Sequence, residues 1–170
     1  MMPAAHKLGF ILAVHPTSRG FGWALFESPL SVVDWGMAHA KQGRNEKLLR
    51  RFERLLSRYE PPVVVLEEFE GGACRRADRI QLLCRNMVHL AACRGMETSV
   101  YRKSTVQAVF ASVGASTRHE IALAIAQRIE AFSHRIPSDR KPWVAEDPRQ
   151  SLFDAAALAL THFAVAGSDS

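Results

Sequence analysis

The order of apolar and polar residues along the chain predicts strands first and helices later. A continuous apolar run from Leu8 to Val14 is typical of a buried strand, and Pro16 to Gly20 after it predicts a turn. Phe21 to Phe26 and Ser31 to Ala38 predict two further strands, joined by a short turn. Three successive strands with short connections indicate an antiparallel meander.

A helix and a second buried strand follow the meander. From Arg44 to Tyr59 apolar residues recur every three or four positions, which is the period of an amphipathic helix, and two prolines end it. Val63 to Leu66 is too short and too rich in β-branched residues for a helix, so it predicts a strand buried on both faces. The glycines at 71 and 72 then lead into a long helix from about Arg75 to Arg94, closed by Gly95.

The next part of the chain predicts one more strand and two helices. Thr98 to Tyr101 is a short strand, and a helix follows from about Ser104 to Ala111. Thr117 and Glu120 form a capping-box pattern, in which hydroxyl and carboxylate accept from backbone amides at the start of a helix. That helix is expected to run to about Ala131.

A long loop and an apolar helix complete the chain. Residues from Ser133 to Glu146 have no periodicity, and loops of this length are often functional. Asp147 is expected as the N-cap and Pro148 as the first residue of a helix whose apolar part is Leu152 to Ala166, followed by a frayed tail. The order of elements predicts one α/β domain over residues 1–170, with a five-stranded mixed sheet and helices on both faces. In this sheet the three-strand antiparallel meander is joined by two parallel strands.

Composition changes this picture little. A chain of 170 residues with 48% hydrophobic and 23% charged residues is ordinary for one folded domain. No apolar run reaches the ~20 residues of a membrane helix, which predicts a cytoplasmic protein without a membrane partner. The three cysteines, at positions 74, 84 and 93, fit neither a zinc spacing nor a disulfide framework and are expected to be reduced.

The charge balance favours a polyanionic partner only moderately. Lys and Arg outnumber Asp and Glu by 22 to 17, which gives a net charge of +5 and a pI of about 9.5. An ordinary basic protein accounts for this excess almost as well as a nucleic-acid-binding protein does. The positions of the charges therefore matter more than their number.

Two acidic residues stand in unusually apolar surroundings. Glu67 follows directly on the buried strand and is delivered to the carboxyl edge of the sheet, where open α/β sheets place their sites. Asp154 lies inside the last, apolar helix, where a buried carboxylate requires an ion pair or a cation. The alternatives are that Glu67 is simply the first solvated residue after its strand and that Asp154 pairs with an arginine.

Three segments together resemble the RuvC-type Holliday-junction resolvases. They are Ile11 to Gly22, Val65 to Phe69 and Phe153 to Leu160, in the order and at the separations of that family. The resemblance implies a ribonuclease-H-like fold and a homodimeric endonuclease that hydrolyses phosphodiester bonds in branched DNA, with roles in recombination and repair. It also implies that Glu67 and Asp154 hold Mg²⁺ or Mn²⁺ ions that activate water.

The resemblance breaks in the first strand, where the family carries an Asp and this chain has His15. Neutral imidazole is a poor ligand for Mg²⁺ and a good one for Mn²⁺ or Zn²⁺. His15 is therefore a candidate catalytic and metal-binding residue, or the mark of a catalytically weakened or inactive nucleic-acid-binding relative, or a turn residue. Ser151 stands where the family often has another ligand, and Asp147, two helical turns before Asp154, is a candidate catalytic and metal-binding substitute.

Six residues are candidates for nucleic-acid binding: Arg75, Arg76, Arg79, Arg118, Lys141 and Trp143. The first three open the helix that follows Glu67, and the last two combine charge with a ring that stacks on bases. Arg118 lies at a helix N-terminus, which also favours phosphate. Basic residues on the helix over residues 44–59 fit either a second DNA arm or a solvated face: Lys47, Arg50, Arg51, Arg54 and Arg58.

Overall fold

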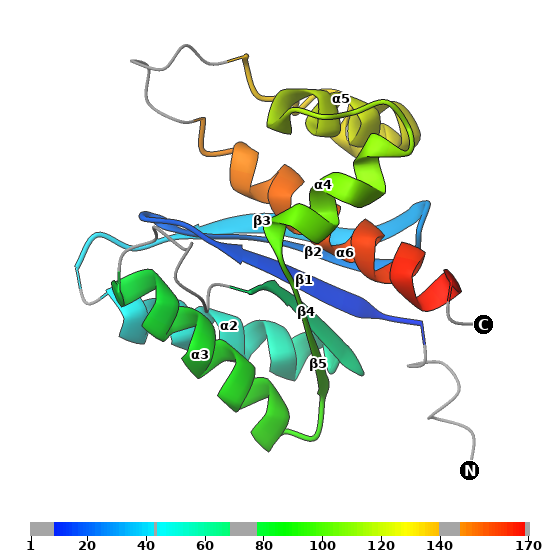
Figure 1. Cartoon of the computed structure of the whole chain (residues 1–170). Helices are drawn as coiled ribbons and strands as arrows, with labels where there is room; N and C mark the ends of the chain where they lie inside the picture. Colours follow the sequence, from blue (N-terminus) through cyan, green and yellow to red (C-terminus); the bar gives the residue numbers. More distant parts are fainter. Residues whose placement is uncertain (1–8, 43, 69–77, 140–146, 169–170) are drawn as a thin grey trace.

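The fold was obtained as a computed structural model, which describes residues 9–42, 44–68, 78–139 and 147–168. The strands are β1 (Ile11–Pro16), β2 (Gly20–Ser28), β3 (Ser31–His39), β4 (Val63–Glu67) and β5 (Glu97–Tyr101). The helices are α2 (Arg44–Tyr59), α3 (Asp78–Cys93), α4 (Lys103–Ala111), α5 (Arg118–Arg128) and α6 (Gln150–Ser168), with a 3₁₀ turn at Glu130–Phe132. Figure 1 shows their arrangement.

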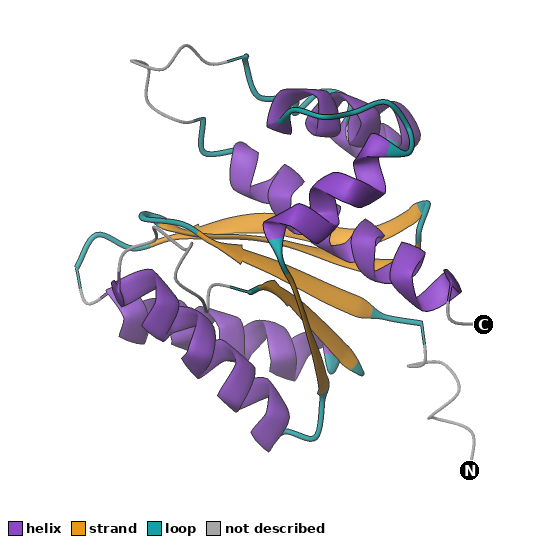
Figure 2. Ribbon diagram, in the orientation of Figure 1, coloured by secondary structure: helices purple, strands orange, loops and turns teal. Residues whose placement is uncertain are grey.

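The strands form one mixed sheet between two layers of helices. Its order is β3-β2-β1-β4-β5, with β2 antiparallel to both neighbours and β1, β4 and β5 parallel to one another. Helices α2 and α3 lie on one face, and α4, α5 and α6 lie on the other (Figure 2). The predicted fold class, a meander plus two parallel strands flanked by helices, is confirmed.

Alternation along the central strands divides the interior into two cores. In β1, Ile11 and Ala13 pack into the core under α6, whereas Leu12 and Val14 pack into the core over α2 and α3. Successive side chains of a strand point to opposite faces, so a strand covered on both sides reads as a continuous apolar run. This is why the sequence of β1 shows no polar alternation.

Helix α6 is the central element of the layer above the sheet. Ala155, Ala156 and Ala159 have no exposed surface and let the helix lie directly on β1 and β2. In the described ranges, α6 is also the one helix long and apolar enough to cross a membrane, but its buried residues from 150 to 161 show that it is a core helix here. The small alanine side chains therefore account for the close packing of α6 on the sheet.

Gly22 in β2 makes this close packing possible. A Cβ atom at this position would lie 2.3 Å from the backbone carbonyl carbon and oxygen of Ser151, at the start of α6. Real Cβ atoms do not approach backbone atoms this closely, so helix and strand would have to separate. Gly22 is also the direct partner of His15 across the β1–β2 pair, so the contact lies beside the candidate site.

We predict that Gly22→Ala lowers the free energy of unfolding by about 1–3 kcal/mol, because the added methyl group overpacks a backbone contact. Chemical denaturation of the purified variant measures this effect. Gly167→Ala is the matched control, since a Cβ there meets nothing within 4 Å, and it should leave stability nearly unchanged. Equal stability of both variants with the wild type would contradict the close contact.

Several predicted boundaries shift. The last helix begins at Gln150 rather than at Pro148, and it continues through Gly167 to Ser168, where a frayed tail was expected. Helix α5 ends at Arg128, before a 3₁₀ turn, instead of at Ala131. The predicted start of the long helix at 75 and the end of the long loop, residues 140–146, lie outside the described residues.

The capping box at α5 is confirmed with one change of partner. The Thr117 hydroxyl accepts from the backbone amide of Glu120 at 3.1 Å, as predicted. The Glu120 carboxylate accepts from the amide of Ser116 at 3.2 Å, one residue before the N-cap. The start of α5 is thereby fixed, and with it the position of Arg118.

Candidate functional site

Strand geometry brings His15 and Glu67 together. The parallel register pairs Ala13 with Val65, and two further residues along each strand place His15 beside Glu67. Both are in the series that faces α6, because residues two apart share a face. His15 Nε2 lies 3.4 Å from Glu67 Oε2, and the two side chains are only 5% and 12% exposed.

Asp154 approaches the same imidazole from the other side. It lies in α6, and its Oδ2 atom is 3.7 Å from His15 Nδ1, with the carboxylate side chain 13% exposed. Each ring nitrogen of His15 therefore faces one carboxylate. The two acids predicted to meet at the sheet edge do lie at the same edge, but the imidazole stands between them.

Arg118 and Gln150 complete the surroundings of Asp154. The Arg118 guanidinium donates from Nε to Asp154 Oδ1 at 3.2 Å and from Nη2 to Oδ2, and Gln150 Nε2 donates to Oδ1 at 3.1 Å. The side chain of Arg118 is bound to this carboxylate and is 39% exposed, and its predicted contact with a phosphate stays a prediction. This contact is the ion pair with an arginine that the sequence left open as an alternative for Asp154.

The pKa of Asp154 reflects both its burial and the side chains that contact it. Burial alone would raise the pKa of this carboxyl group. A positive charge on His15, together with the hydrogen bond and charge of Arg118, outweighs burial and lowers the pKa below the ordinary value of an aspartate. Asp154 is therefore held as an anion, with the Arg118 guanidinium bound to it and the His15 ring facing it.

This arrangement does not fit a pair of Mg²⁺ ions. Mg²⁺ requires converging oxygen ligands in near-octahedral geometry, whereas the imidazole here separates Glu67 from Asp154. Within the described residues, no group of three or more His, Cys, Asp or Glu side chains is arranged to hold a metal ion. Nitrogen atoms of His15 and Arg118, which belong to the protein, face the carboxylates that would otherwise bind the metal ions.

Asp147, the fourth predicted ligand, has a different partner. Its carboxylate accepts from the backbone amide and the guanidinium of Arg149, with distances from 2.7 to 3.2 Å. Hydrogen bonds to Arg149 lower the pKa of Asp147 and outweigh the effect of burial. Asp147 also lines a hollow of about 410 Å³ with Arg118 and Gln150, so it lies near the site without contacting His15 in any described interaction. Ser151 donates its hydroxyl to the Pro148 carbonyl at 3.0 Å.

Two arginines gather at the turn that follows β1. Arg79 donates to the carbonyl of Ser18 at 2.7 Å, and Arg44 donates to the same oxygen at 2.9 Å. Arg79 is thus bound to the turn after β1, and its predicted role in nucleic-acid binding stays a prediction. Arg75, Arg76, Lys141 and Trp143 lie outside the described residues. Neither Arg44 nor Gln150 was predicted, and neither carries a local sequence signal, since both contacts depend on chain segments that meet only in the fold.

Comparison with known proteins defines the class of fold. No family model and no curated protein matches the sequence. The architecture is ribonuclease-H-like, with the strand order of RuvC. The chain has the fold of RuvC and other Holliday-junction resolvases over about nine tenths of its length, which confirms the resemblance at the level of the fold.

Three solved structures illustrate the similarity. Thermus thermophilus RuvC in complex with a Holliday-junction substrate has 17% sequence identity and a TM-score of 0.65, covering 94% of this chain and 95% of that one. The yeast mitochondrial Holliday-junction resolvase Ydc2 has 14% identity and a TM-score of 0.59, covering 90% and 78%. Fowlpox virus resolvase with junction DNA has 11% identity and a TM-score of 0.52, covering 89% and 99%.

Proposed function

We propose that this chain binds branched DNA at the carboxyl edge of its sheet and does not hydrolyse it with Mg²⁺. One observation carries the proposal: the imidazole of His15 lies between Glu67 and Asp154, the two carboxylates that a metal-dependent nuclease would direct at one ion. Of the two functions that the sequence left open, this geometry favours the binding protein over the Mg²⁺-dependent endonuclease.

Charge compensation supports this choice. Buried carboxylates need positive partners, and metal ions supply that charge in a metal-dependent nuclease. Here Arg118 supplies positive charge to Asp154 from the protein itself, and the His15 ring fills the space between the two acids, so the free energy of binding Mg²⁺ must include the cost of displacing them. Imidazole is also a weak ligand for Mg²⁺. Both effects disfavour occupancy by this ion.

The choice of branched DNA rests on the fold and on local charge. Two structures of similar fold are bound to Holliday-junction DNA, and in this chain Arg44 and Arg79 converge on Ser18 just beyond His15. Guanidinium groups bind phosphates by charge and hydrogen bonds, and this binding requires no metal ion and no cleavage. A homodimer, as implied by the resemblance, would present two such edges to a four-way junction.

We predict that the purified protein binds a four-way junction more tightly than a linear duplex, and that affinity falls steeply from about 50 to about 200 mM salt. Fluorescence anisotropy measures the affinities. Incubation of the complex with Mg²⁺ followed by denaturing electrophoresis should show intact strands. Cleavage of the junction with Mg²⁺ would contradict the proposal that His15 prevents Mg²⁺-dependent hydrolysis. Undetectable binding at low salt would contradict DNA binding itself.

An endonuclease that uses a transition metal is the second candidate. The 3.4 Å between His15 Nε2 and Glu67 Oε2 matches the separation of two ligands that share one tetrahedral ion at about 2.0–2.2 Å. Imidazole suits Mn²⁺ far better than it suits Mg²⁺. Cleavage that appears with Mn²⁺ and not with Mg²⁺ in the same assay would favour this candidate.

A further inference from the structure

Helix α2 carries most of the net positive charge of the chain. It contains six basic and two acidic side chains, a net charge of +4, compared with +5 for the whole sequence. Its apolar face, with Leu48, Phe52 and Leu56 fully buried, fixes the rotation of the helix on the sheet. The basic side chains are therefore held on one outward surface.

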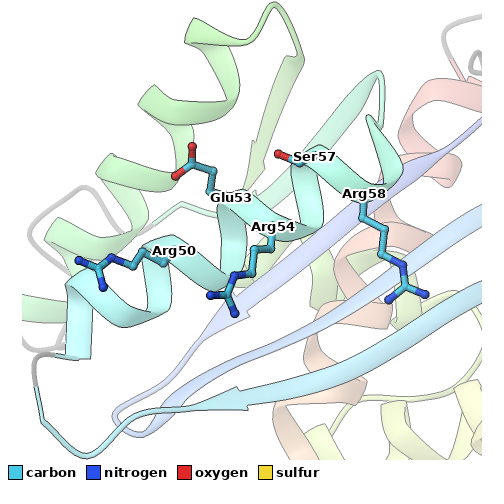
Figure 3. A pocket seen from close by; sticks show the side chains of 5 residues that line it. All are labelled: Arg50, Glu53, Arg54, Ser57 and Arg58. Carbon is cyan, nitrogen blue, oxygen red and sulfur yellow. The ribbon is translucent and has the colours of Figure 1, made fainter.

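Three of these arginines form a single row. Arg50, Arg54 and Arg58 follow one another along α2, while Glu53 and Ser57 of the same helix point toward α3 (Figure 3). Residues four apart in a helix are separated by roughly 6 Å along its axis, so the row spans roughly 12 Å. The five side chains line a shallow hollow of about 570 Å³.

The acids near this row do little to neutralise it. Glu53 already accepts from Arg94 at 2.9 Å, and the same guanidinium also donates to Ser57. Arg58 lies over the Tyr59 ring, with 5.1 Å between its central carbon and the ring centroid. Among the described residues no carboxylate pairs with Arg54, and the side chains of the Arg50–Glu46 pair are largely exposed, at 66% and 72%. Such pairs are weak, so a phosphate can replace Glu46.

The helix that carries the row begins beside the turn that follows His15. Arg44, at the start of α2, donates to Ser18 in the turn after β1, and Asn45 donates to the backbone carbonyl of Arg79. The N-terminus of α2 therefore lies at the edge of the sheet that carries His15. From this edge, Arg50, Arg54 and Arg58 extend along the face formed by α2.

We infer that Arg50, Arg54 and Arg58 bind the phosphate backbone of a duplex arm that leaves the candidate site along α2. This inference rests on the proposed DNA-binding function and adds the path of the DNA. Phosphates of one strand recur every 3.4 Å along the duplex axis, so an arm parallel to α2 presents several within reach of the row. Guanidinium groups bind phosphates of any sequence, which suits a substrate recognised by shape.

The test replaces the row by neutral side chains. The triple variant Arg50→Gln, Arg54→Gln, Arg58→Gln should bind a long-armed four-way junction roughly 10–100-fold more weakly at about 50 mM salt, and the slope of log affinity against log salt should fall by about 3. The control makes the same charge change on the opposite side of the sheet: Lys103→Gln, Arg128→Gln, Arg135→Gln. It should retain most of the affinity and slope.

A single substitution provides a second test of this path. Arg54→Gln alone, which disturbs no described ion pair, should lower the salt slope by about 1 and serves if the triple variant is unstable. Wild-type slope in the Arg50, Arg54 and Arg58 variant overturns the inference and leaves junction binding intact. A wild-type protein that binds no junction overturns both.

Discussion

The variant His15→Asp is expected to unfold at a temperature that depends strongly on Mg²⁺, whereas the wild-type protein should not. The substitution removes the imidazole from between Glu67 and Asp154 and leaves three carboxylates together. Without metal, their repulsion destabilises the fold. At a Mg²⁺ concentration 100-fold above its dissociation constant, binding restores about 2.7 kcal/mol, which raises the melting temperature by roughly 5–10 °C for a domain of this size.

Differential scanning fluorimetry with Mg²⁺ or EDTA measures this shift without any cleavage. His39→Asp, a change of the same kind at an exposed position on β3, should show no Mg²⁺ dependence. We also expect the His15→Asp variant to gain Mg²⁺-dependent cleavage of a four-way junction. If Mg²⁺ stabilises the wild type as much as the variant, the interpretation of His15 as a replacement for metal is wrong.

The strand pattern was sufficient to predict the edge of the sheet that carries the site. Val63 to Leu66 is short, β-branched and apolar, so its C-terminal Glu67 had to emerge at a sheet edge. The buried run before His15 placed this residue at the same edge, because β1 and β4 are parallel neighbours. Asp154 was predictable from its apolar surroundings, since a buried carboxylate needs a compensating partner.

The partners inside the site could not be predicted in the same way. The contact between Arg118 and Asp154 joins residues 36 positions apart, and it depends on how α5 packs against α6. The direction of the His15 ring depends on the distance between β1 and α6, which Gly22 sets by contact with Ser151. The packing of α5 on α6 and the spacing between α6 and the sheet are properties of the folded chain, and the order of residues alone does not give them.

The start of the last helix was predicted from local residues, and the fold differs from that prediction only in where the regular helix begins. Asp147 followed by Pro148 is a favourable N-terminal pair, which predicted a cap at Asp147. In the fold, the Asp147 carboxylate accepts from the amide and guanidinium of Arg149, and its carbonyl accepts from the amide of Gln150. Asp147 therefore makes the predicted capping hydrogen bond, on a turn that leads into the regular helix at Gln150.

The fold fixes the positions of the two acids independently of any catalytic role. Glu67 and Asp154 have their positions fixed by a strand and a helix that also carry core residues. Buried carboxylates need hydrogen-bonded or charged partners whether or not the protein cuts DNA. Arg118 provides such a partner for Asp154 from α5, and His15, from β1, faces both acids.

Loss of the ion pair between Arg118 and Asp154 should have the second large effect. We predict that Arg118→Met lowers the free energy of unfolding by roughly 3 kcal/mol at neutral pH, the lower end of the range for a buried ion pair that loses one partner, because Arg118 itself is partly exposed. Methionine keeps most of the apolar stem and removes the charge. Urea denaturation followed by tryptophan fluorescence measures the change.

The pH dependence of this loss distinguishes an ion pair from a packing defect. Because the pKa of Asp154 is lowered in the fold, its ionisation contributes stability that is present above the unfolded pKa of about 3.9 and is lost as the pH falls through the folded value. Arg118→Met removes part of that contribution, so the difference between variant and wild type should be largest near pH 7 and shrink below about pH 4. Arg102→Met, which breaks the exposed pair with Glu68, should cost less than about 1 kcal/mol at any pH. A loss in Arg118→Met that stays constant into acid would mean that Arg118 acts by packing, and that Asp154 does not depend on its charge.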